Sequence, residues 1–227
     1  MERSEVERIL GAVEAQLGAE PEAGLEGSGF WKAVAAVKRD PGLVEEYAGR
    51  IAAADRTAFE RWALLTVPIA VGTAATLVGT ALGLVLVGLA YSTPDPWNGI
   101  LLLAGSGVLL VATHGLAHLV AGRLVGIRFT HWFIGTVARP QPGVKTDYAA
   151  YLAATARGRA WMHASGALVS KVVPFALIPA GVIAGVPEWA TILLGAVGVV
   201  SVITDILWST KFSDWKKFRR EIAIARR

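Results

Sequence analysis

The sequence predicts an all-α polytopic membrane protein with four transmembrane helices, a small helical N-terminal region and a cytoplasmic-side loop that contains short β-strands. Apolar residues make up 54% of the 227 positions and the mean hydropathy is +0.50, values too high for an ordinary soluble domain. Four segments stay apolar over the roughly 20 residues that a helix needs to cross a bilayer. Lys and Arg gather in one long loop and in the tail.

Residues 1–61 form an acidic region that we expect to be cytoplasmic and helical. It holds twelve Asp and Glu against eight Lys and Arg, and its charged start is unlike a cleavable signal peptide. Apolar residues recur at helical spacing over 6–17, 30–37 and 43–51, which predicts three short helices. Asp40 and Pro41 suit the N-cap and first position of the third helix. The region is too small to bury a large core alone, so we expect it to pack on the membrane part, and its net charge of −4 favours docking on the basic loop or tail.

Residues 62–210 form the predicted membrane core. The predicted spans cover residues 62–91, 99–125, 164–185 and 189–208. The loop at 126–163 alternates apolar and polar residues near its start, which predicts a short strand, and with Arg123 just before it the segment carries six Lys and Arg. The turns at 92–98 and 186–188 carry none, so the positive-inside rule places both termini in the cytoplasm. We therefore expect a multi-pass protein of the plasma (inner) membrane.

Four ionisable residues lie in the interior of the predicted spans, where charged groups are costly and usually functional. His114 and His118 are one helical turn apart on one face, which is the spacing of a zinc-binding helix. From the predicted cytoplasmic ends, His118 and Asp205 lie about 7.5 Å deep. Lys171 lies about 10 Å deep and His114 about 13 Å deep, so all four fall in one layer. The chain has no cysteine, so a metal there would be held by His, carboxylate or water.

Two interpretations of this layer compete. In the first, His114, His118 and Asp205 together hold a metal ion. In the second, the two imidazoles make hydrogen bonds across helices and Asp205 forms an ion pair with Lys171 on the neighbouring helix. A lysine paired to Asp205 would neutralise the charge that a metal needs, so the two interpretations exclude one another at that residue.

Three segments carry a resemblance to a known family. Residues 114–118 read HGLAH, residues 165–170 read SGALVS, and Thr204-Asp205 lies in the last predicted span. In this order they resemble the HExxH motif, the GPxxN segment and the third-ligand aspartate of the site-2 protease family of intramembrane zinc metalloproteases, over about residues 99–210. The resemblance implies that His114, His118 and Asp205 bind zinc, with the strands of the loop forming a sheet at the membrane edge.

Gly115 stands where that family carries its catalytic glutamate. The glutamate acts as general base on metal-bound water, and such a base contributes about 10²–10⁴-fold in rate. The resemblance therefore implies a pseudoenzyme that keeps a divalent-metal site, with zinc as the expected metal, and binds a membrane segment or partner protein without cutting it. The alternative is an active intramembrane zinc metallopeptidase that uses a non-standard base.

The tail at 211–227 is predicted to be a basic amphipathic helix. It carries seven Lys and Arg against two acidic residues, and Trp215 lies among the apolar residues of one helical face. We expect the tail to lie on the inner leaflet through Trp215, Lys216, Lys217, Arg219 and Arg220. The lipid bilayer is therefore the expected partner of the tail, and nucleic acid is not.

Overall fold

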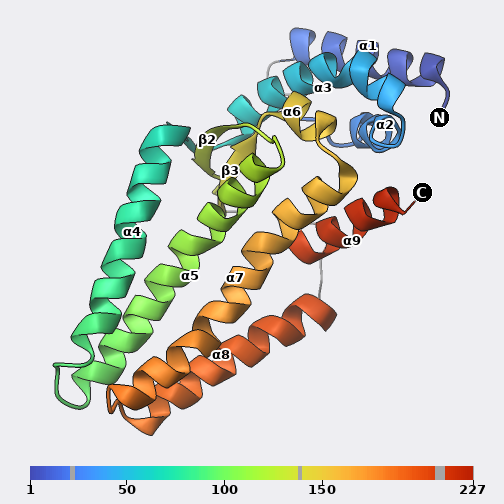
Figure 1. Cartoon of the computed structure of the whole chain (residues 1–227). Helices are drawn as coiled ribbons and strands as arrows, with labels where there is room; N and C mark the ends of the chain where they lie inside the picture. Colours follow the sequence, from blue (N-terminus) through green and yellow to red (C-terminus); the bar gives the residue numbers. More distant parts are fainter. Residues whose placement is uncertain (21–23, 138–139, 208–212, 227) are drawn as a thin grey trace. The chain divides into compact units, whose positions relative to one another are not determined.

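The computed structural model describes residues 1–20, 24–137, 140–207 and 213–226 (Figure 1). It contains two compact units. The first comprises Met1–Ile69, Gly122–Arg159 and Ile222–Arg227, and the second Ala70–Ala121 and Ala160–Glu221. Among the described residues helices dominate, four of them are long and apolar enough to cross a membrane, and one small sheet is present. The predicted all-α polytopic fold with a short strand-containing loop is thereby confirmed.

Three helices at the N-terminus bury one apolar core in the first unit. They are α1 (Arg3–Ala19), α2 (Phe30–Val37) and α3 (Pro41–Trp62). Their apolar residues at helical spacing face one another and are almost fully buried, among them Leu10, Phe30 and Ile51. The carboxylate of Asp40 accepts hydrogen bonds from the amides of Gly42 and Leu43, so α3 begins with the predicted cap.

A three-stranded antiparallel sheet belongs to the same unit, in the order β1-β2-β3. Its strands are β1 (Leu65–Pro68), β2 (Phe129–Ile134) and β3 (Pro142–Thr146), and the short helix α6 (Tyr148–Ala153) follows. Leu65 pairs with Ile134 and Pro68 with His131. The first apolar helix consequently begins at Ile69 rather than at 62, because the residues before it end α3 and form β1.

The N-terminal helices pack on the loop of residues 126–163. Leu152 of α6 belongs to their apolar core, and the ring of Phe59 on α3 meets Phe133 of β2 edge-on at 5.1 Å between centroids. Asp55 of α3 and Lys145 of β3 form an ion pair of 2.5 Å, with side chains only 8% and 15% exposed. Docking on the loop was one of the two expected alternatives, and the contact combines this ion pair with apolar packing.

The second unit contains all of α8 (Glu188–Leu207) and most of the other helices that follow β1 and are labelled in Figure 1, apart from α6: α4 (Ile69–Leu89), α5 (Trp97–Leu124), α7 (Ala156–Ile183) and, at the tail, α9 (Asp214–Ala225). Helices α4, α5 and α7, and residues Glu188–Asp205 of α8, have the length and hydropathy of membrane spans. Large apolar side chains remain exposed on them, for example Val111 at 69% and Val78 at 68%. Such exposure suits lipid rather than water. The predicted end of the fourth span at 208 and the start of the tail helix at 211 lie outside the described residues.

Small residues let these helices approach closely. A Cβ atom on Gly105 of α5 would lie 2.8 Å from the carbonyl oxygen of Gly83 on α4, so α4 and α5 meet there backbone to backbone. Further along the unit, Leu102 of α5 and Leu194 of α8 are fully buried in one apolar cluster. Gly166 of α7 leaves room for the ring of His118 on α5. This last contact positions the candidate site.

Candidate metal centre

The two histidines of α5 point toward each other from successive turns. Their Nε2 atoms lie 3.2 Å apart and their rings are nearly perpendicular, with 4.8 Å between centroids. The i, i+4 spacing places both on one helical face, as the sequence predicts. The His118 side chain is 11% exposed and the His114 side chain 38% exposed. The pair is therefore shielded from its surroundings at His118 and accessible at His114.

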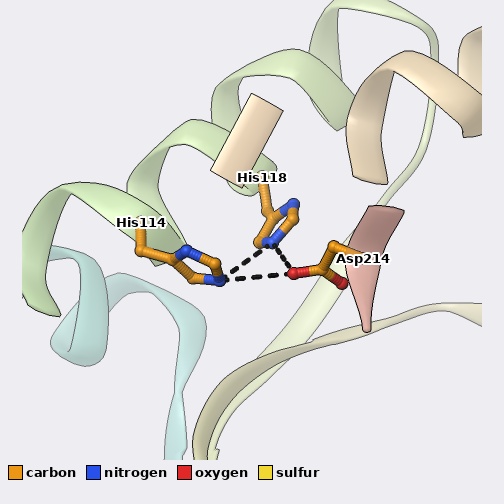
Figure 2. Close-up of side chains that lie close together, drawn as sticks. All are labelled: His114, His118 and Asp214. Carbon is orange, nitrogen blue, oxygen red and sulfur yellow. Dashed lines mark hydrogen bonds and ion pairs between the residues drawn. The ribbon is translucent and has the colours of Figure 1, made fainter. Parts of the chain in front are cut away.

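Asp214, the first residue of α9, completes the group (Figure 2). Its Oδ2 lies 3.1 Å from Nε2 of His118 and 3.4 Å from Nε2 of His114. Ser213 precedes it and accepts a hydrogen bond from the amide of Lys216 at 3.2 Å, which closes the first turn of α9 and presents Asp214 to the imidazoles. Within the part of the chain that the structure describes, these three residues are the group whose geometry could hold a metal ion.

Hydrogen bonds at the far side of each ring orient the two imidazoles. Nδ1 of His118 donates to the carbonyl oxygen of Met162 on α7 at 2.6 Å. Nδ1 of His114 lies 2.8 Å from Oγ of Ser170, and that hydroxyl itself donates to the carbonyl oxygen of Gly166 at 3.1 Å. If the Ser170 hydroxyl donates to Gly166, His114 is the donor to Ser170. Both rings then carry their protons on Nδ1, which leaves both Nε2 lone pairs facing the centre of the group.

With both protons on Nδ1, three electron-pair donors converge without a proton between them. Two Nε2 lone pairs and a carboxylate oxygen at 3.1–3.4 Å repel one another unless a cation lies among them. In a tetrahedral zinc site with bonds of about 2.0–2.1 Å, neighbouring ligand atoms lie about 3.3–3.4 Å apart. The three observed separations match that spacing closely. Two imidazoles and one carboxylate also form a known donor set for a divalent transition metal, with positions left for other ligands.

The surroundings of Asp214 keep its carboxylate charged. Burial by itself would raise the pKa of the Asp214 carboxyl. When the imidazoles carry protons on Nε2 and no metal is bound, hydrogen bonds from His114 and His118 and the charge of Lys217 outweigh burial and hold the pKa well below its ordinary value. Nζ of Lys217 donates to Oδ1 at 3.0 Å, so the other carboxylate oxygen remains directed at the histidines. His163 of α7 also lies near, with Nδ1 3.9 Å from Oδ1. A carboxylate that is ionised at neutral pH is the form that binds a metal.

Asp205, the third ligand implied by the family resemblance, lies elsewhere. The structure joins its carboxylate to the ammonium group of Lys171, which also donates to the carbonyl oxygen of Ala167 at 3.1 Å. This is the ion pair of the second interpretation, and the carboxylate beside the histidines is that of Asp214 instead. The structure thus brings His114 and His118 together with Asp214, and it pairs Asp205 with Lys171. Gly115 is buried on α5 between the two histidines.

The sequence did contain a signal for Asp214. It is one of only two acidic residues in a basic tail, it follows a serine that can cap a helix, and it comes soon after the last apolar span.

The residues of the tail that were predicted to lie on the membrane surface divide into two groups. Lys216, Arg219 and Arg220 are exposed, whereas Lys217 is partly buried against Asp214. Trp215 stacks on Phe218 at 5.1 Å between ring centroids.

Comparison of the chain with protein-family models, with curated proteins and with solved structures gave no match. The structure supports a membrane protein with a His-His-Asp group that is able to hold a metal ion.

Proposed function

We propose that this chain is a proteolytically inactive membrane protein of the site-2-protease type that binds zinc at His114, His118 and Asp214 and holds a membrane segment of a partner beside the metal. The observation that carries the proposal is the convergence of two Nε2 lone pairs and a carboxylate oxygen at the spacing of a tetrahedral site. Asp214 replaces Asp205 in the ligand set. When bound, zinc would supply a Lewis acid with a coordination position left for another ligand.

The residue at position 115 supports the absence of proteolysis. Glycine has no side chain to accept a proton from water, and the described His-His-Asp group holds no second carboxylate. Since Asp214 is a ligand in this proposal, it is not free to act as the general base. Loss of the base alone lowers the rate by about 10²–10⁴-fold, which favours a binding role over a hydrolytic one.

An exposed apolar face of α5 supports the binding of a membrane segment. Val111 precedes His114 by one helical turn on the same face and is 69% exposed within the described chain. The His114 side chain is itself 38% exposed. A partner helix that packs over Val111 would therefore reach the open side of the metal centre. Small-residue and apolar packing of this kind is how helices associate within a bilayer.

Metal content tests the ligand set directly. The wild-type chain, purified and reconstituted in nanodiscs, is expected to carry about one zinc per chain by elemental analysis. His114→Ala and Asp214→Asn should lose the zinc, because each removes one ligand. The matched control is Asp205→Asn, which alters an acidic residue of the same unit that lies against Lys171, and it should retain the metal. Loss of zinc in Asp205→Asn but not in Asp214→Asn would contradict the proposed ligand set. A metal-free wild type would contradict zinc binding itself and leave a shared proton as the cation among the three side chains.

Two further assays address partner binding and proteolysis. A photo-crosslinking amino acid at Val111 should capture a membrane segment more efficiently than the same amino acid at Val78, which is equally exposed but lies on α4. The zinc-loaded protein should leave fluorogenic transmembrane peptides intact. Cleavage that a chelator abolishes would favour the active metallopeptidase instead.

We also propose that both termini face the cytoplasm and that the protein resides in the plasma (inner) membrane. The support is that the long loop and the tail are rich in Lys and Arg, whereas the turns at 92–98 and 186–188 carry none. The chain has no cysteine, so single cysteines can be introduced without background. In intact cells, a membrane-impermeant thiol reagent should label Ser92→Cys, which lies between the first two spans, and should spare Ser4→Cys. The opposite labelling pattern would reverse the orientation.

A further inference from the structure

The helix that supplies Asp214 also carries an exposed cationic face. Lys216, Arg219 and Arg220 are all exposed on α9 and recur at the i, i+3 and i+4 spacing of one helical side. Asp214, Lys217 and Glu221 are less exposed and lie on another side of the same helix. One face of α9 is therefore directed at the metal centre and another presents three positive charges.

An aromatic cluster fixes where the first turns of α9 lie along the membrane helices. The ring of Phe218 packs 5.8 Å from Trp161, and Trp215 stacks on Phe218. Trp161 lies near the first residue of α7, which is the end of a candidate span, and it is 53% exposed. Tryptophans at the ends of spans mark the level of the lipid headgroups. The cationic face of α9 therefore lies at the depth where phosphate groups are found.

We propose that Lys216, Arg219 and Arg220 bind the headgroups of anionic phospholipids and that this binding tightens the metal centre. Charge complementarity and the adjacent tryptophans identify the lipid class. The coupling follows because one short helix carries both functions: headgroups hold α9 in the position that presents Asp214 to His114 and His118. A ligand that favours this position raises the affinity for any second ligand that needs it. The inference rests on the proposed zinc site and names its regulation.

The test measures zinc affinity in two bilayers. The full chain is reconstituted in nanodiscs of phosphatidylcholine, or of phosphatidylcholine with about one third phosphatidylglycerol, and titrated with zinc sulfate against a chromophoric chelator. Zinc is expected to bind about tenfold more tightly in the anionic bilayer, which corresponds to about 1.4 kcal/mol. The variant K216Q/R219Q/R220Q should lose this gain, because it keeps every metal ligand but removes the headgroup contacts.

A matched variant controls for the attraction of zinc itself to a negatively charged bilayer. R8Q/K32Q/R39Q removes three exposed cations from the N-terminal region, and it should keep the tenfold gain. Equal zinc affinity in the two bilayers, or a gain that survives in K216Q/R219Q/R220Q, would overturn the coupling and leave the metal site standing. Weaker zinc binding in the anionic bilayer would also overturn the coupling, because headgroups would then draw α9 away from His114 and His118. Absence of zinc binding in both bilayers would overturn the proposed function together with the coupling.

Discussion

Substitution of Gly166 by alanine should disrupt the metal centre without touching a ligand. A methyl group on Gly166 would lie 2.6 Å from Cε1 and 2.8 Å from Cδ2 of the His118 ring, and closer still to Nε2. Carbon atoms that are not bonded prefer about 3.5–4.0 Å, so the ring and the methyl group must separate by about 1 Å. The hydrogen bond of 2.6 Å from Nδ1 to Met162 would lengthen to about 3.6 Å, beyond hydrogen-bonding distance.

The expected effect on zinc binding follows from this displacement. Loss of an orienting hydrogen bond weakens metal affinity by about 10–100-fold, and overpacking between two helices costs about 1–3 kcal/mol of stability. If α7 moves in place of the ring, Met162 and Ser170 move with it and the same hydrogen bonds are lost. Zinc competition titrations in nanodiscs measure the affinity, and thermal unfolding of the metal-free protein separates it from a loss of folding.

Gly107→Ala supplies the matched control. Gly107 lies on α5 with the two histidines, and a Cβ atom there would meet nothing within 4 Å. The Gly107→Ala variant should therefore bind zinc with wild-type affinity. Wild-type affinity in Gly166→Ala would refute the reasoning, because it would mean that the close contact between α7 and His118 does not exist. An equal loss in both variants would show that the effect reports on glycine replacement in general.

Three further predictions concern stability, each measured by thermal or chemical unfolding of the purified chain. Lys171→Leu should destabilise the protein by about 3 kcal/mol because it leaves Asp205 as an unpaired charge. Replacement of both residues by leucine should restore stability. Equal stability of the single and double variants would argue against the ion pair. Gly105→Ala should cost about 1–3 kcal/mol, since its methyl group would lie 2.8 Å from the carbonyl oxygen of Gly83, and an unaltered melting temperature would exclude that close approach. Asp40→Ala should cost about 1 kcal/mol through loss of the cap of α3, whereas Asp40→Asn should cost little, and identical melts of the two variants would contradict a capping role.

Local patterns in the sequence were sufficient to predict most helices. The apolar spacing over 30–37 predicts α2 with the bounds that the structure has, and Asp40 caps α3 as expected. The start of the first membrane helix was not predictable in this way. Leu64, Leu65 and Val67 are as apolar as a span, and only pairing with β2 shows that Leu65–Pro68 is a strand. Gly166 likewise has no local signature, because its role depends on a ring from another helix.

The same distinction between local patterns and tertiary contacts holds for the residues of the candidate site. The sequence by itself determined that His114 and His118 share one face of an apolar helix, since that follows from their spacing alone. It also placed Asp205 at the depth of His118, but depth is a single coordinate and says nothing about the rotation of a helix about its axis. Only the tertiary structure decided that Asp205 meets Lys171 and that Asp214, from the first turn of the tail helix, meets the two imidazoles. Those contacts join residues of different helices, and the packing of those helices is settled by the side chains of the whole unit rather than by any local pattern.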